Sequence, residues 1–218
     1  MNPVVLYHTE HAKKTRREIL LVAVDIASAE GLENLSIGRL AKELRMSKTG
    51  IFAHFGSKQQ LQLATVDAAS EIFLQQVVQP VLQIPQGLRR LRAMLESWLG
   101  YIEQSVFRGG CFFAAVSAEF DSRPGKVRDN IAALTKAWVV ALQDEIALAT
   151  ANGELLRDVN QNELAFELHA YVQEANWAFK MFNDRSAFML AKSAIANRID
   201  RAVNPGSIKP SRKLRSAK

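Results

Sequence analysis

The sequence is poor in residues that interrupt helices and in the residue that forms disulfides. Among 218 residues there are 6 prolines, 11 glycines and a single cysteine, Cys111. One cysteine cannot form a disulfide within the chain, which fits a reducing compartment. No apolar run reaches the roughly 18 residues of a membrane span, and no cluster of basic residues opens the chain. We therefore expect a cytoplasmic protein with no membrane partner and no signal peptide.

Motifs of the common enzyme classes are also missing. The sequence contains no G-x-S-x-G, H-E-x-x-H, P-loop or G-x-G-x-x-G pattern. Its 4 histidines and one cysteine show no spacing typical of a metal site. These absences favour a protein that is not an enzyme and that has no cofactor and no bound metal.

What the sequence does have is apolar residues at helical spacing over most of its length. This period predicts helices over residues 9–30, 57–79, 87–104, 111–120, 127–150, 161–183 and 185–203, after a loose arm at 1–8. We find no alternating strand pattern and no internal repeat. The predicted fold class is all-α.

The most specific pattern lies in residues 36–61, which read SIGRLAKELRMSKTGIFAHFGSKQQL. Ser36, Ser47 and Ser57 are each placed to cap a helix, the last of them in an S-x-x-Q capping box. Two short helices joined by a tight turn form a helix-turn-helix, whose second helix lies in the major groove of DNA. A three-helix DNA-binding head is therefore predicted, with the helix over 9–30 as its brace.

This segment resembles the DNA-binding domain of the TetR family of bacterial transcriptional regulators. The matching features are the S-I-x-x-L-A frame, the M-S before the second helix, the aromatic-x-His-Phe ending and the S-K-x-x-L that follows. Two positions depart from the family pattern. Arg45 stands where a turn glycine is usual, so we expect it at positive φ. Phe52 stands where tyrosine is common, and it lacks the hydroxyl that would bond to a phosphate.

The resemblance implies a homodimer that binds double-stranded DNA at an inverted-repeat operator and is released from it by a small-molecule effector. Lys48, Lys58 and the serine hydroxyls suit phosphates, whereas Thr49 and Gly50 lie where the second helix would meet base edges. By register, the family's base-reading position on the first helix matches Gly38 better than Arg39. The predicted DNA contacts are Ser36, Arg39, Ser47, Lys48, Thr49, Gly50, Phe52, His54 and Lys58.

Charge is unevenly distributed along the chain. Residues 1–58 hold nine basic and six acidic side chains, residues 59–205 hold fourteen and sixteen, and residues 206–218 hold five and none. Basic ends around a mildly acidic middle agree with polyanion contact confined to the ends. We predict a DNA-binding head over 1–56, a ligand-binding and dimerisation body over 57–205, and a mobile basic tail over 206–218.

An effector pocket within the body is a further implication of the resemblance. Three tryptophans lie on three different predicted helices, and polar residues among them could orient a ligand. The predicted lining is Trp98, Phe112, Phe113, Glu119, Trp138, Asn176 and Trp177, with His169 and Tyr171 as further candidates. Aromatic residues on helical stripes are also typical of plain core, so that alternative stays open here. Cys111 is interpreted as a packing residue, not a redox sensor.

The segment 161–183 carries apolar residues on more than one face. A helix that is apolar most of the way round needs cover on two sides. The chain has few further helices that could cover the second apolar side. We therefore expect a second copy of the chain to cover it. The predicted dimer interface is Phe166, Trp177, Phe182, Phe188, Ile195 and Ile199.

Other functions are compatible with the sequence. Transcriptional activation and ligand-independent DNA binding use the same head. A helical small-molecule-binding protein or enzyme with an incidental helix-turn-helix is a further alternative. Steep salt dependence of binding to a preferred DNA site would separate the DNA-binding regulators from this last class.

Overall fold

The computed structural model describes the backbone of residues 3–207 and the side chains of residues 14–206. The helices are α1 (Pro3–Glu30), α2 (Ile37–Leu44), α3 (Lys48–Phe55), α4 (Lys58–Phe73), α5 (Leu88–Glu103), α6 (Phe112–Phe120), α7 (Lys126–Ala151), α8 (Gln161–Phe182) and α9 (Ser186–Ala202). Residues 3–207 contain no strand, although one isolated antiparallel bridge joins Leu155 to Val203. The all-α prediction is confirmed. Of the predicted tail, residues 208–218 lie outside the described residues.

Two helix boundaries differ from those predicted. The loose arm is wrong for residues 3–8, because α1 begins at Pro3, and proline is well suited to a first helical position. The helix predicted over 57–79 changes its winding part of the way along. After Phe73 it continues as a π-helical segment, η1 (Leu74–Val78), and a 3-10 turn, η2 (Gln79–Val81). A second 3-10 turn, η3 (Pro205–Ser207), follows α9.

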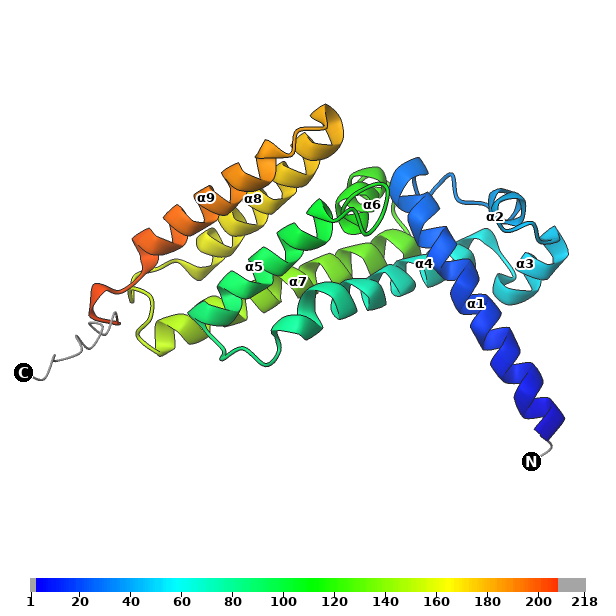
Figure 1. Ribbon diagram of the computed structural model, residues 1–218, viewed down its shortest axis with the longest axis horizontal. Coiled ribbons are helices and arrows are strands. Elements are labelled where there is room, and N and C mark those ends of the chain that lie inside the picture. Colours follow the sequence, from blue (N-terminus) through cyan, green and yellow to red (C-terminus); the bar gives the residue numbers. More distant parts are fainter. Residues whose placement is uncertain (1–2, 208–218) are drawn as a thin grey trace, which may run out of the picture.

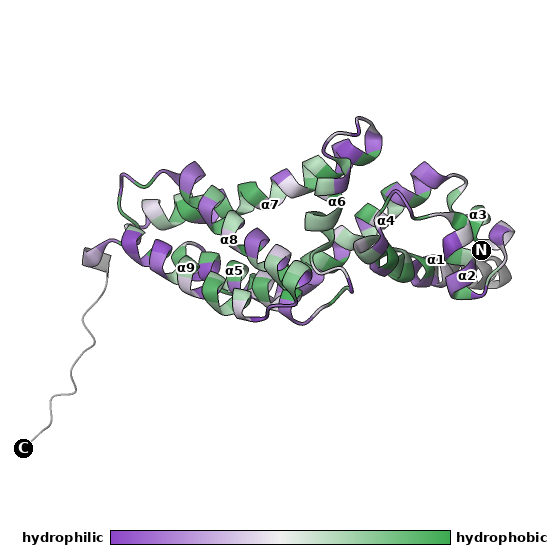
Figure 2. Cartoon of the chain, turned by 90° about the horizontal axis from the view of Figure 1, so that it is seen from above, coloured by the Kyte–Doolittle hydropathy of each residue, from purple (hydrophilic) through white to green (hydrophobic). Residues whose placement is uncertain are grey.

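The chain is elongated, with α1–α3 at one end and the pair α8–α9 along the edge of the other (Figure 1). Helix α4 links the two parts, because it packs against α1 and α3 near its start and against α7. Seen from above, hydrophobic and hydrophilic residues alternate along the body helices, as expected of amphipathic helices (Figure 2). None of the helices within residues 3–207 has the length and apolar character needed to cross a membrane.

Candidate nucleic-acid interface and ligand cavity

Three serine caps fix the geometry of the helix-turn-helix. The hydroxyl of Ser36 accepts a hydrogen bond from the backbone N–H of Arg39, Ser47 accepts from Gly50, and Ser57 accepts from Gln60, over 3.0–3.1 Å. The three predicted caps are confirmed. Each hydroxyl accepts through a lone pair and keeps its own O–H free to donate. Ser36 and Ser47 therefore hold their helices while remaining able to bind an anion.

The turn between α2 and α3 is closed by Arg45. Its φ of 53° is left-handed, as predicted, and its N–H bonds to the carbonyls of Ala41 and Lys42. This conformation is unusual for a residue with a Cβ. The Arg45 side chain is exposed beside the start of α3, where sequence reasoning had not placed a DNA contact. The sequence feature that could have indicated this contact is a basic residue in the turn before the second helix.

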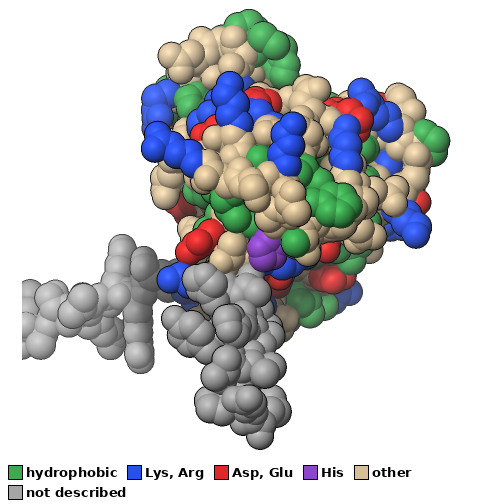
Figure 3. Space-filling view, turned by 90° about the vertical axis from the view of Figure 1, so that its right-hand side faces the viewer, with side chains coloured by type: hydrophobic (Ala, Val, Ile, Leu, Met, Phe, Trp, Pro, Cys, Tyr) green, Lys and Arg blue, Asp and Glu red, His purple; other side chains and the backbone are tan. Residues whose placement is uncertain are grey.

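Helix α3 has a buried side and an exposed side. Ile51 and Phe55 are buried, whereas Lys48 and Thr49 are exposed and Phe52 is 50% exposed. Residues 48, 49 and 52 lie within one turn of each other on the outer side of the helix. Viewed from the head end, basic side chains are spread over this face of the molecule, with hydrophobic groups among them (Figure 3). The outer side of α3 can therefore approach a polyanion.

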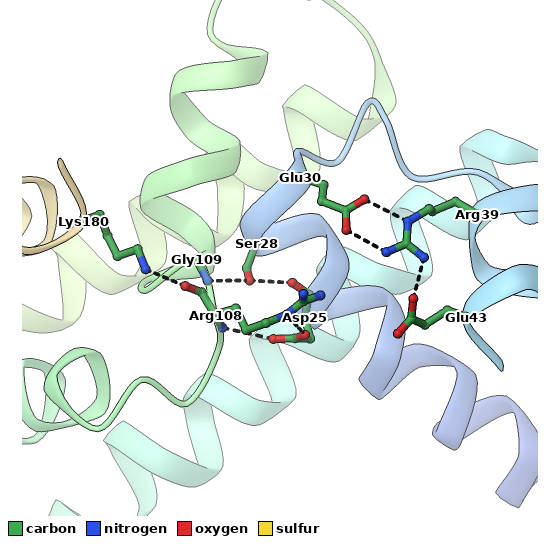
Figure 4. Close-up of polar contacts among 8 residues, drawn as sticks. All are labelled: Asp25, Ser28, Glu30, Arg39, Glu43, Arg108, Gly109 and Lys180. Carbon is green, nitrogen blue, oxygen red and sulfur yellow. Dashed lines mark hydrogen bonds and ion pairs between the residues drawn. The ribbon is translucent and has the colours of Figure 1, made fainter. Parts of the chain in front are cut away.

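Arg39, a predicted DNA contact, has two carboxylate partners within the chain. Its guanidinium binds Glu30 of α1 through two hydrogen bonds of 2.9 and 2.7 Å, and it binds Glu43 at 2.6 Å (Figure 4). The bond to Arg39 lowers the pKa of the Glu30 carboxyl. In this structure Arg39 joins α2 to the end of α1, which differs from the role predicted from sequence.

Two further basic residues, Arg16 of α1 and Lys58 at the start of α4, also have partners within the chain. The Lys58 ammonium lies 2.7 Å from Glu33, and this bond lowers the pKa of the Glu33 carboxyl. Arg16 donates to the carbonyl of His54 at 3.2 Å and stacks over the ring of Phe55. The predicted contact His54 is half-buried. Arg16 therefore joins α1 to the last turn of α3, the predicted recognition helix.

A cavity of about 300 Å³ lies among the helices of the body. It is lined by α4, η1, α5, α7 and α8, together with Cys111 and Phe113 at the start of α6. Of the predicted lining residues, Trp98, Phe113 and Trp138 border it, as does His169. The π-helical segment contributes Leu74 and Val78, which sequence reasoning missed. No regular apolar period signals a π-helix, so its side chains could not be assigned to this wall.

Four of the predicted lining residues lie elsewhere. Phe112 is fully buried in the core. Glu119 accepts hydrogen bonds from the N–H groups of Leu32 and Glu33, beyond the end of α1. Asn176 accepts one from the Cys111 N–H at 2.9 Å. Trp177 is 48% exposed and packs edge-to-face against Phe182. The helical period placed these residues on the correct helices but could not tell which neighbour each one meets.

Several exposed apolar side chains belong to the α8–α9 pair. Phe166 is 72% exposed and Phe182 is 64% exposed. Phe188, Ile195 and Ile199, which were predicted for the dimer interface, are instead buried within the chain. They pack beneath the surface and do not form it. Three exposed residues that sequence reasoning missed belong to the same pair of helices: Met181, Met189 and Leu190.

The loop between α5 and α6 joins the head, the cavity and α8 (Figure 4). The Arg108 N–H and guanidinium both donate to Asp25 of α1, and the Gly109 N–H donates to the Ser28 hydroxyl. Lys180 of α8 donates to the Arg108 carbonyl at 2.6 Å. Cys111, which ends this loop, borders the cavity. Burial raises the pKa of the Cys111 thiol, in keeping with its interpretation as a packing residue.

No cluster of three or more His, Cys, Asp or Glu side chains suited to a metal ion occurs in the part of the chain that the structure describes. The head offers hydroxyls and exposed Lys and Arg side chains, whereas the cavity offers hydroxyls, indoles, an amide and an imidazole. The arrangement therefore offers two binding surfaces: the outer side of α3 and the mainly apolar cavity.

Two family models match the sequence. The model described as "Bacterial regulatory proteins, tetR family" matches residues 19–65, and "Tetracyclin repressor-like, C-terminal domain" matches residues 87–195. The transcriptional regulator TcmR of Streptomyces glaucescens is 24% identical over 122 residues, which are 55% of this chain and 53% of that protein. The match thus spans about half the length of this curated relative.

Solved structures resemble the chain over most of its length. A TetR transcriptional regulator from Chloroflexus aurantiacus has a TM-score of 0.82 and 22% identity, covering 89% of this chain and 98% of that one. AibR, in complex with isovaleryl coenzyme A and operator DNA, has a TM-score of 0.67 and 25% identity, covering 84% of this chain and 96% of that one. The match includes both the head and the body.

Proposed function

The chain belongs to the TetR family of DNA-binding transcriptional regulators, and we propose that it is a homodimeric repressor released from its operator by a small molecule. The observation that carries this proposal is the exposed side of α3, a helix capped by Ser47 and bound to α1 through the Arg16 bond to His54. A helix presented in this way fits the major groove, where its first residues meet base edges.

Within this proposal, Lys48 and the hydroxyls of Ser36 and Ser47 bind phosphates. Thr49 and Gly50 meet base edges, and the exposed ring of Phe52 contacts the thymine methyl or the sugar beside them. Arg45 adds a phosphate contact. We assign Arg39 to holding α2 against α1, because Glu30 and Glu43 occupy its donors.

The dimer proposal is supported by the exposed apolar residues of α8 and α9. A two-fold axis beside this pair would bury the same residues of both copies. It would also present two α3 helices to successive major grooves, roughly 34 Å apart. The operator is then an inverted repeat. AibR, a relative in fold, was crystallised with both operator DNA and a small ligand, which supports control by an effector.

Selection of DNA sites from a random pool tests the proposed function. We expect an enriched inverted repeat whose half-site centres lie about 10 base pairs, or a multiple of this spacing, apart. Enrichment of single half-sites, or no enrichment, would contradict a two-fold dimer that reads sequence. A reporter gene placed behind the selected site should be transcribed less when the protein is present. Increased transcription would identify an activator.

Lys48→Ala is expected to weaken binding to every DNA sequence alike. A dimer would lose two phosphate contacts, so the slope of log affinity against log salt should become shallower by about 2. The measurement is a salt titration of affinity for the selected site and for a scrambled one. Arg201→Ala removes one positive charge from the exposed end of α9, far from α3 (Figure 1), and should leave the slope unchanged. Equal slopes for the two variants would show that Lys48 does not contact a DNA phosphate.

A further inference from the structure

Three residues that line the cavity each have a buried polar side-chain atom without a partner among the described residues. Within the described residues, the Trp138 Nε1, Trp98 Nε1 and Thr135 Oγ1 atoms are buried and make no hydrogen bond to a nitrogen or oxygen, and all three residues line the cavity. Trp98 has the Cys111 thiol beside it, a weak acceptor. Trp138 and Thr135, three residues apart on α7, lie on the same side of that helix. Buried donors without acceptors are unfavourable and uncommon in folded proteins.

The rest of the wall is uncharged and mostly apolar, with Ser70, His169 and Gln173 as its other polar residues. None of the described lining residues is Asp, Glu, Lys or Arg. His169 also lines the cavity, and burial lowers the pKa of its ring, so the ring is neutral at pH 7. An ion entering this site would lose its hydration without gaining an opposite charge. Charged ligands are therefore disfavoured.

Aromatic rings of the cavity wall pack against one another. Phe73 packs edge-to-face against Trp138, with ring centroids 4.9 Å apart, and Trp98 packs edge-to-face against Trp138 at 5.5 Å. In each edge-to-face contact, the edge of one ring covers part of the face of the other. Cation binding by aromatic residues requires the ring faces, and free N–H donors at the same wall oppose a positive charge.

We infer that the cavity takes a neutral, mainly apolar molecule bearing a carbonyl or similar hydrogen-bond acceptor, held by the Trp138 N–H and the Thr135 hydroxyl. This inference rests on the proposed function, in which the occupant of the cavity is the effector. A volume of about 300 Å³ suits a small aromatic or alicyclic ketone, ester or lactone. The apolar body of the ligand would contact the rings, while its acceptor would satisfy donors that have no partner within the protein.

Calorimetry with the DNA-free full-length protein tests this with four probes of similar shape. They are 2-acetylnaphthalene, the hydrocarbon 2-isopropenylnaphthalene, the anion 2-naphthoate and the cation trimethyl(2-naphthyl)ammonium. The ketone should bind about tenfold more tightly than the hydrocarbon, as one hydrogen bond predicts, and more tightly than either ion. A hydrocarbon that binds as well as the ketone, an ion that binds best, or no binding by any probe would overturn the inference.

Two variants test which protein groups bind the hydrogen-bond acceptor of the ligand. Thr135→Val keeps the shape of the side chain and removes the hydroxyl, and Trp138→Phe keeps an aromatic ring and removes the N–H. Each should lower the affinity for the ketone by roughly three- to tenfold and leave the affinity for the hydrocarbon unchanged. Thr150→Val, on the same helix but outside the cavity, should alter the binding of neither probe. Equal losses for both probes in the two cavity variants would show that shape and not hydrogen bonding decides binding.

Release from the selected operator is measured separately with the ketone. Release supports both proposals. A ketone that binds with the expected variant effects but leaves the operator occupied supports the ligand chemistry and overturns control by an effector at this cavity. Sequence-specific operator binding by a protein that takes up none of the probes overturns the ligand chemistry alone.

Discussion

Trp177→Glu is expected to convert the dimer into a monomer and to abolish high-affinity operator binding. Trp177 is half-exposed on α8, beside Phe182 and on the same pair of helices as Phe166, so a dimer would bury two copies of it. Losing a central aromatic contact costs about 2 kcal/mol per copy, and a buried unpaired carboxylate costs more. The dimer dissociation constant should therefore rise by at least roughly 1,000-fold. Analytical ultracentrifugation and operator titration measure the two effects.

Leu82→Glu is the matched control for this experiment. Leu82 is 49% exposed, nearly as much as Trp177, but it follows η2 and does not belong to α8 or α9. The same negative charge at this position should leave the dimer intact. Circular dichroism checks that both variants retain their helices. An unaltered dimer in Trp177→Glu, or equal dissociation in both variants, would show that the chain associates through another surface or not at all.

Gly109→Ala is expected to destabilise the junction between head and body. A Cβ at this position would lie 1.8 Å from the Ser28 carbonyl oxygen, which belongs to backbone and cannot rotate away. The loop would have to withdraw from α1, breaking the Gly109 bond to Ser28 and straining those of Arg108 to Asp25. We expect a cost of at least about 2 kcal/mol, which lowers the Tm by roughly 4–8 °C for a chain of this size. Thermal unfolding followed by circular dichroism measures the shift.

Gly100→Ala provides the comparison. Gly100 lies inside α5, and a Cβ there would meet only the end of the flexible Gln104 side chain at 3.7 Å. Alanine is favoured over glycine within a helix by about 0.5–1 kcal/mol, so this variant should melt at or above the temperature of the unaltered protein. If both variants had the Tm of the unaltered protein, the close approach of Gly109 to Ser28 would not contribute to the stability of the fold.

The head could be predicted in detail because its signals are local. Ser36, Ser47 and Ser57 each cap a backbone N–H three residues ahead, a contact that depends on sequence spacing alone. The positive φ of Arg45 followed in the same way from its place in a tight turn. The partners of Arg39 could not be predicted, because Glu30 lies on a different helix and meets it only after α1 and α2 have packed.

In the body, the helices could be predicted but their packing partners could not. The helical period identified its helices, yet it gave each helix only an apolar side and not the identity of the helix facing that side. Phe188 was predicted for the surface and is buried, whereas Leu190, two residues on, is exposed. Asn176 was predicted for the cavity and binds the Cys111 N–H instead. Each error concerns a neighbour supplied by a distant part of the chain.

By itself, the sequence determined the helical class, the caps and turn of the helix-turn-helix, and the family resemblance, because all of these depend on residues within about one or two helical turns of each other. Only the tertiary structure decided which basic residues of the head remain exposed and which aromatic residues line the cavity. It also brought Trp138 and Thr135 to the cavity lining, each with a hydrogen-bond donor that has no acceptor within the described residues. These features depend on packing between distant helices, which no local pattern of residues records.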